Sequence, residues 1–264
     1  MENKLETRLR NLAVFQICDS TFPIGTFNHS FGMENYLRNG LIDDANQFSE
    51  WLTNYYQSQF KYGEGLLTLL VYQALDCDNF NQLQYLDDVI TKSTLARETR
   101  DGTKVIAKQM VILIQKIYGN QIKDLNQYAE LMEHGKVYGN PAIVFAIFAH
   151  YQGVSKQDAY LMYGYSVAST LVQNAVRAIP LGQREGQVVL NRIIKQLGDL
   201  YQESCQYDVS YLGANTPGLE LAQINHETQN ARYLCHRKIG GTTNETSSTN
   251  WSRGTSRFRQ DTID

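Results

Sequence analysis

The stretch from Asp19 to Glu34 reads DSTFPIGTFNHSFGME, and it decides how the chain begins to fold. It holds one proline, two glycines, three phenylalanines and two carboxylates between two apolar segments. Because proline fixes φ and glycine accepts a positive φ, Pro23 and Gly25 favour a tight turn. We therefore expect an ordered loop that its phenylalanines anchor on a core, rather than a single regular element.

A short helix is predicted to follow this loop. Ser30 is a suitable N-cap residue, and Gly40 is suited to end the helix. The apolar face would be formed by Met33, Tyr36 and Leu37, which follow one another at helical spacing.

Composition places the chain among ordinary globular proteins. It has 264 residues, 42% hydrophobic and 19% charged, with a net charge of −3 and a pI near 6.0. This balance gives no sign of the basic surface that nucleic-acid binding requires. The apolar run Pro141 to Ala149 is short of the roughly 20 residues of a membrane span, and the charged first residues do not form a secretory signal. We expect a soluble cytoplasmic protein that binds neither nucleic acid nor membrane.

The four cysteines, Cys18, Cys77, Cys205 and Cys235, are far apart and form no C-x-x-C pair. Neither a zinc ribbon nor a redox motif can be written from them. Free thiols in a reducing cytosol fit this spacing best, and no cofactor is indicated.

The rest of the chain repeats apolar residues every three or four positions, which predicts helices and no strands. Leu66 to Leu75 is apolar on nearly all sides, as in a buried helix, and Gly63-Glu64-Gly65 is expected to break the helix before it. Gly102 indicates a close helix approach, a bend or a short loop. The fold is predicted to be all-α, a single domain of roughly eight to ten helices. Helical patterns cover residues 48–62, 80–90, 105–118, 141–151, 159–175 and 188–201.

Local sequence also indicates where some helices begin. Asp124 with Gln127, and Ser155 with Asp158, resemble capping boxes. Pro141 suits the first turn of a very apolar helix, because the N–H that proline lacks would have no partner there.

The last segment changes character. A final helix is expected to start near Thr216 and to hold His226, Glu227 and Arg232. Beyond about Ile239 the chain is rich in Ser, Thr, Asn, Gly and Arg, and it cannot bury enough surface to offset its ordering entropy. We expect a helical domain over 1–238 and a disordered tail over 239–264.

No catalytic constellation can be assembled from the motifs. The chain lacks a phosphate-binding loop and an H-E-x-x-H motif. His226 and Glu227 are adjacent, so on a helix their side chains diverge by about 100°. Ser20 and Ser30 near His29 are a weak indication of a nucleophile, since every long sequence contains such pairs.

Two functional alternatives stay open at this point. The first is a helical metal-dependent enzyme whose fold brings together His29, Glu34, His134 and His226, although a loop histidine more often bonds to backbone. The second is a GTPase activator that supplies Arg177 as an arginine finger. Such an arginine can equally cap the C-terminus of its own helix.

Four stretches together resemble the urease accessory protein UreF family. They are Asp19-Ser20-x-x-Pro23-x-Gly25-x-Phe27-x-His29-Ser30-x-Gly32-x-Glu34, Ala96-Arg97-Glu98-x-Arg100, Ala175-Val176-Arg177-x-x-Pro180-Leu181-Gly182-Gln183-x-x-Gly186-Gln187 and His226-Glu227-x-Gln229-x-x-Arg232. They stand in the family's order and span about residues 8 to 234.

The resemblance implies a helical scaffold that is not an enzyme and has no catalytic or metal-binding residue of its own. It implies a homodimer that binds UreD (UreH) and recruits the GTPase UreG to deliver nickel to apo-urease. The implied partner-binding residues are Arg177, Gln183, His226, Glu227, Arg232 and Tyr233. The implied structural loop comprises Asp19, Ser20, Pro23, Gly25, His29, Ser30, Gly32 and Glu34.

The chain departs from the family at its end. Members usually finish soon after the arginine matched by Arg232, whereas this chain continues through Tyr233 to Lys238 and on to Asp264. Either the extension is natural or the reading frame has slipped near Leu234. If docking in this family depends on its last residues, the extension would alter UreD binding.

Overall fold

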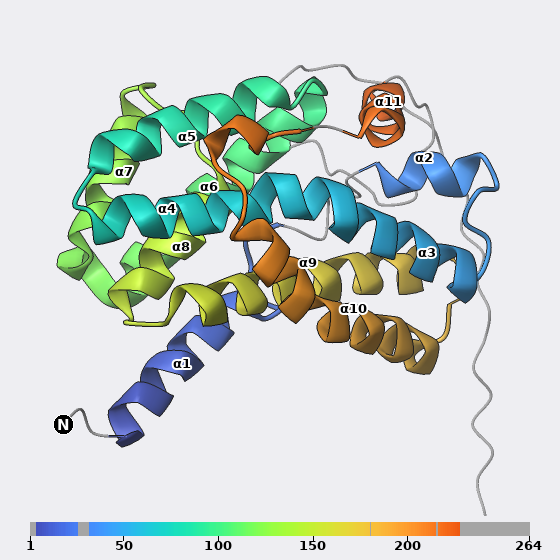
Figure 1. Cartoon of the computed structure of the whole chain (residues 1–264), viewed down its shortest axis with the longest axis horizontal. Helices are drawn as coiled ribbons and strands as arrows, with labels where there is room; N and C mark the ends of the chain where they lie inside the picture. Colours follow the sequence, from blue (N-terminus) through green and yellow to red (C-terminus); the bar gives the residue numbers. More distant parts are fainter. Residues whose placement is uncertain (1–3, 26–31, 180, 215, 228–264) are drawn as a thin grey trace, which may run out of the picture.

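The computed structural model describes residues 4–25, 32–179, 181–214 and 216–227. Within these ranges every regular element is helical and no strand is present, which confirms the all-α prediction (Figure 1). The predicted boundary between domain and tail lies outside the described residues. The helices are α1 (Lys4–Cys18), α2 (Met33–Arg38), α3 (Ala45–Tyr55), the π-helix η2 (Tyr56–Gly65), α4 (Leu66–Asp76), α5 (Phe80–Ser93), α6 (Arg97–Tyr118), α7 (Lys123–Glu133), α8 (Pro141–Tyr151), α9 (Lys156–Ala178), α10 (Gln183–Ser204) and α11 (Pro217–His226), with 3₁₀ turns η3 (Gly119–Gln121) and η4 (Val209–Tyr211).

The core is built around α4 and α8, which pack against each other. Residues 141–149 are all buried in α8, and nine of the eleven residues of α4 are buried. This all-round burial explains why both helices show apolar residues on every face. Pro141 stands in the first turn of α8 as predicted, and the Asn140 side chain accepts a hydrogen bond from the Ala142 N–H at 2.9 Å.

One long helical run passes from α3 through η2 into α4. The predicted break at Gly63-Glu64-Gly65 is a kink, because Gly63 has φ −99° and ψ −113° while helix continues on both sides. If α3, η2 and α4 are counted as one helix, the described residues hold ten helices longer than a 3₁₀ turn. Inside the run, aromatic rings follow one another from Trp51 through Tyr55 and Tyr56 to Phe60.

The helix starts test the capping predictions. The cap at Ser155 is confirmed, since its hydroxyl accepts from the Asp158 N–H at 3.0 Å. The capping box at Asp124 is wrong: Ile122 is the N-cap, and Asp124 lies in the first turn of α7, where its charge still suits the helix dipole. Gly102 is buried inside an unbroken α6, so the short-loop reading is wrong.

The opening stretch forms a tight turn directly after α1. The Asp19 carboxylate accepts from the N–H and hydroxyl of Thr21, both at 2.6 Å, and the Phe22 N–H donates to the Asp19 carbonyl at 2.9 Å. Phe22 is buried as expected, and Gly25 has φ 87°. The predicted anchors Phe27 and Phe31 lie outside the described residues.

Helix α2 begins two residues later than Ser30 would place it. Its N-cap is Gly32, at φ 89°, and no side chain caps it. Ser30 itself lies outside the described residues. Across the described ranges, no helix is both long enough and apolar enough to cross a membrane.

Candidate functional site

Three of the motif stretches meet where α2, α6 and α11 come together; α2 and α11 lie side by side in Figure 1. His226, the last residue of α11, joins all three helices. Its Nε2 lies 2.9 Å from Glu34 Oε2 on α2, and its Nδ1 lies 3.0 Å from Glu98 Oε2 on α6. We call these three residues the His226 cluster.

The approach of α11 to α2 depends on Gly32. A Cβ built at this position would lie 3.0 Å from Gln223 Cγ and 3.2 Å from Leu219 Cδ1, both on α11. Because Gly32 also has a positive φ, only glycine fits without strain. The chain therefore enters α2 in close contact with α11. Glu34 lies in the first turn of α2 and is thereby placed beside His226.

Helix α11 also supplies acceptors to the start of α6. The N-cap of α6, Ala96, has no side chain that can accept, so the first N–H groups need partners from elsewhere. The Glu98 N–H donates to Glu227 Oε1 at 3.2 Å, and the Leu95 N–H donates to Glu220 Oε2 at 3.3 Å. Two carboxylates at a helix N-terminus are also favoured by the helix dipole.

Burial strengthens the interaction between His226 and the two carboxylates, because little water screens their charges. The side chains of Glu34 and His226 are 2% and 11% exposed, against 24% for Glu98. The hydrogen bond to Glu34 raises the pKa of His226, the bond to Glu98 raises it further, and burial opposes both. Burial also raises the pKa of Glu220. The site is thus a charged, largely buried joint between helices.

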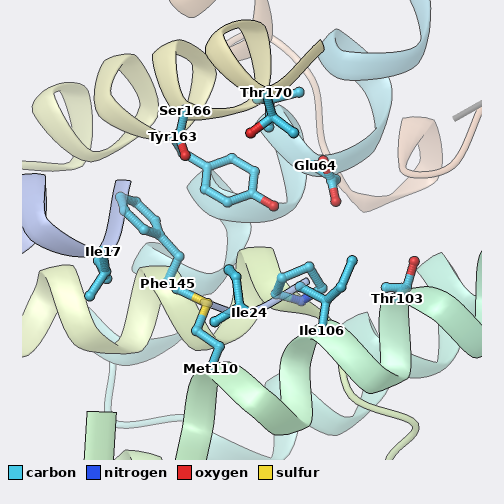
Figure 2. A pocket seen from close by; sticks show the side chains of 12 residues that line it. Ile17, Ile24, Glu64, Thr103, Ile106, Met110, Phe145, Tyr163, Ser166 and Thr170 are labelled. Atoms are coloured by element: carbon cyan, nitrogen blue, oxygen red, sulfur yellow. The ribbon is translucent and has the colours of Figure 1, made fainter. Parts of the chain in front are cut away.

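A small cavity of about 50 Å³ lies beneath the opening turn (Figure 2). Its walls are mainly apolar, but the Tyr163 hydroxyl is directed toward the Glu64 carboxylate and hydrogen-bonds to it. Burial raises the pKa of Glu64 to about 7, while the tyrosine bond opposes the shift. The cavity is too small for an organic cofactor. Its other lining residues are Ile17, Ile24, Thr103, Ile106, Met110, Pro141, Phe145, Ser166, Val167 and Thr170.

The structure brings together only some of the predicted site residues. Glu34, His226 and Glu227 meet at the joint, with Gly32 beside them. Arg177 and Gln183 lie at the other turn, at the end of α9 and the start of α10; the Arg177 guanidinium donates to Asn174 Oδ1 at 3.2 Å. Asp19, Ser20, Pro23 and Gly25 form the turn after α1, and His29, Ser30, Arg232 and Tyr233 lie outside the described residues.

Of the four proposed metal ligands, Glu34 and His226 contact each other, and His29 lies outside the described residues. His134 is exposed at the end of α7, where its Nδ1 lies 2.7 Å from the Glu130 carbonyl. Within the described ranges, no group of three or more His, Cys, Asp or Glu side chains is arranged to hold a metal ion.

Sequence reasoning missed Glu98 and Glu220 as site residues. Glu98 stands inside the quoted motif Ala96-Arg97-Glu98-x-Arg100, so the motif itself was the available signal. Glu220 carries no such signal, because its role depends on a backbone N–H that lies 125 residues away in the sequence.

Comparison with known proteins agrees with the motifs. A protein-family model described as UreF matches residues 42–194. The urease accessory protein UreF of Streptococcus salivarius strain 57.I is 56% identical over 218 residues, which are 83% of this chain and 91% of that protein. Urease accessory protein UreF of Bacillus sp. strain TB-90 is 39% identical over 84% of this chain and 97% of its own length, and that of Lachnoclostridium phytofermentans is 35% identical over 84% and 96%. The motif match, the family model and these relatives agree, and the chain belongs to the urease accessory protein UreF family.

Proposed function

We propose that this protein is a cytoplasmic scaffold for urease maturation and has no catalytic activity of its own. In this proposal it binds UreD (UreH), recruits the GTPase UreG, and so supports nickel insertion into apo-urease. The observation that carries the proposal is the joint itself. Residues of three motif stretches, Glu34, Glu98 and His226, bond to one another. These bonds support a fixed place for α11 on α2 and α6, which a docking surface of defined shape requires.

The partner surface that we propose for UreD is the outer face of α11. Leu221 and Ile224 are 59% and 38% exposed there, three residues apart on one face, and Glu227 is exposed at the helix end. Two apolar side chains on a helix that the cluster fixes in place would give a partner apolar surface to bury.

This surface can be tested without disturbing the joint. We expect Leu221→Asp to reduce copurification of UreD at least tenfold, because a carboxylate would be buried without a partner, while circular dichroism and Tm stay unchanged. Tyr85→Asp, at a 51% exposed site on α5, is the matched control and should keep UreD. Equal UreD recovery with both variants would remove α11 from the interface.

The function itself is tested in cells. Deleting the gene should lower urease activity and the nickel content of urease, and the wild-type gene should restore both. Unchanged urease activity in the deletion strain would refute the maturation role.

Self-association is the second part of the proposal. Leu5, Leu9, Leu12 and Phe15 of α1 are 49% to 61% exposed, and their spacing places them along one side of the helix. Helix α1 extends away from the bundle in Figure 1. A second copy of the chain is the partner that we propose for this apolar stripe.

The role of Arg177 as a GTPase activator stays a prediction. Its guanidinium contacts Asn174 within α9, which suits a helix-end position as well as a finger. GTP turnover by UreG with wild type against Arg177→Ala separates the two readings, since equal rates would exclude the finger.

A further inference from the structure

The hydrogen bonds of His226 require a proton at both ring nitrogens. A carboxylate ion can only accept hydrogen bonds, and the neutral imidazole has one N–H and one lone pair. Both nitrogens face carboxylate oxygens, at 2.9 and 3.0 Å. The cluster therefore holds one proton more than a neutral histidine with two carboxylate ions.

The surroundings favour that extra proton. Glu34 faces the ring from α2 and Glu98 from α6. Glu220 of α11 accepts from the Leu95 N–H just before α6, and Glu227, which follows α11, accepts from the Glu98 N–H. On α6, the Arg100 guanidinium donates to the carbonyls of Thr94 and Leu95 at 2.6 and 2.7 Å. The ring thus lies among carboxylates, which stabilise an imidazolium.

Loss of the proton would change the joint from attractive to repulsive. A lone pair of the ring would then face a carboxylate oxygen at hydrogen-bond distance. Glu34, whose side chain is 2% exposed, would lose the attraction of the imidazolium inside the fold, where water screens charges least. Because His226 is the last residue of α11, the repulsion acts directly on that helix.

The direction of the pH dependence follows from linkage. The Glu34 and Glu98 bonds raise the pKa of His226 above its usual 6.5. Stability from such a group is fully present below the unfolded-state pKa, near 6.5, and is lost as the pH rises through the folded-state pKa.

We propose that the His226 cluster is a proton-dependent latch that holds α11 on α2 and α6 at acidic to neutral pH and releases it in alkaline solution. The latch would regulate the partner surface on α11, and in this respect it rests on the proposed function. It adds a regulatory input that requires no further ligand.

Hydrogen exchange of the full chain between about pH 6 and 9, corrected for intrinsic exchange, tests the latch. Amide protection in α11 should fall by up to about tenfold per pH unit between the unfolded-state pKa, near 6.5, and the folded-state pKa, and should level off above it, because one proton is released on opening. Protection in α8 should not change. His150→Gln is the matched histidine control, since His150 of α8 pairs with Asp76 of α4 at 3.1 Å, and it should behave as wild type does.

Two variants of the His226 cluster should change the pH dependence of α11 protection in opposite ways. In Glu98→Gln the side-chain amide can donate to the lone pair of the neutral ring, so α11 should stay protected at alkaline pH. In His226→Gln the protection of α11 should be low and independent of pH. Flat protection in wild type, or the wild-type slope in Glu98→Gln, would overturn the latch.

UreD binding is measured in a separate experiment, so that the proposed function and the proposed latch can each be refuted without the other. Wild type should retain less UreD at about pH 8.5 than at about pH 6.5, and Glu98→Gln should retain it equally. If UreD binds at neither pH, the proposed function fails while the exchange result still decides the latch. If binding is the same at both pH values although α11 opens, the latch does not control this surface.

Discussion

At the scale of single residues, glycine at position 32 decides whether the joint can close. Gly25 and Gly32 have nearly the same positive φ, 87° and 89°. A Cβ at Gly25 would meet no described residue within 4 Å, whereas one at Gly32 would press on Gln223 and Leu219 of α11. Comparing an alanine substitution at Gly25 with one at Gly32 therefore separates the cost of backbone strain from the cost of crowding against α11.

We expect Gly25→Ala to cost about 1–2 kcal/mol of unfolding free energy, from strain in the left-handed region alone. Gly32→Ala should cost the same amount plus a crowding term of about 1 kcal/mol or more. It should also raise hydrogen exchange in α11, which Gly25→Ala should not do. Urea denaturation and exchange of both variants give the comparison, and equal effects would show that contact with α11 does not require this glycine.

One buried carboxylate, Asp87, lies outside the joint between α2, α6 and α11. Asp87 is fully buried and accepts hydrogen bonds from the Tyr128 hydroxyl and from the N–H groups of Tyr138 and Gly139. It fixes the loop before α8. Burial raises its pKa while the three donors oppose the shift, and we assign it a structural role because its oxygens hold the backbone of that loop.

At the scale of elements, the π-helix η2 is the least regular part of the core. Its end is crowded at Gly65, where a Cβ would lie 2.8 Å from the Phe60 carbonyl oxygen and 2.9 Å from the Phe60 ring. The backbone of Gly65 is an ordinary right-handed helix, with φ −62° and ψ −55°. Glycine is needed there for space, not for conformation.

Gly65→Ala should therefore destabilise the protein by about 1–3 kcal/mol, since a backbone carbonyl cannot move aside as a flexible side chain can. Gly198→Ala, on the exposed face of α10 with nothing within 4 Å of the new Cβ, should stabilise it by about 0.5–1 kcal/mol. Thermal unfolding of the two variants decides the point. A neutral Gly65→Ala would mean that η2 relaxes to an α-helix.

Element prediction from sequence succeeded where local signals act alone. The all-round apolar pattern of α4 and α8, Pro141 and the Ser155 cap were read correctly. The π-helix was not, because its i→i+5 bonding has no local sequence signature. Helix α1 is not among the predicted helices. Its mixed charges indicate only that the first residues are not a secretory signal, and its leucines do not face the core. Glu98 and His226, 128 residues apart, pair only in the fold.

At the scale of the whole molecule, the chain separates its proposed contacts onto different ends. The joint and the exposed face of α11 lie beside α2, whereas the apolar stripe of α1 lies on a helix that extends away from the bundle (Figure 1). Self-association through α1 would therefore leave α11 of each copy open to a partner.

The double variant Leu9→Glu with Leu12→Glu tests this arrangement. Burying each leucine contributes roughly 1.5–3 kcal/mol, and a symmetric dimer would bury four, so even half of that value predicts a dimer weakened by about 100-fold or more. Sedimentation equilibrium at micromolar concentration should find wild type as a dimer and the variant as a folded monomer. Thr7→Glu with Tyr85→Glu adds the same charge at exposed sites off the stripe, and it should remain dimeric. A wild-type monomer, or a double variant that still dimerises, would show that the stripe does not bind a second copy. UreD recovery by the folded monomer then shows whether α11 works independently of α1.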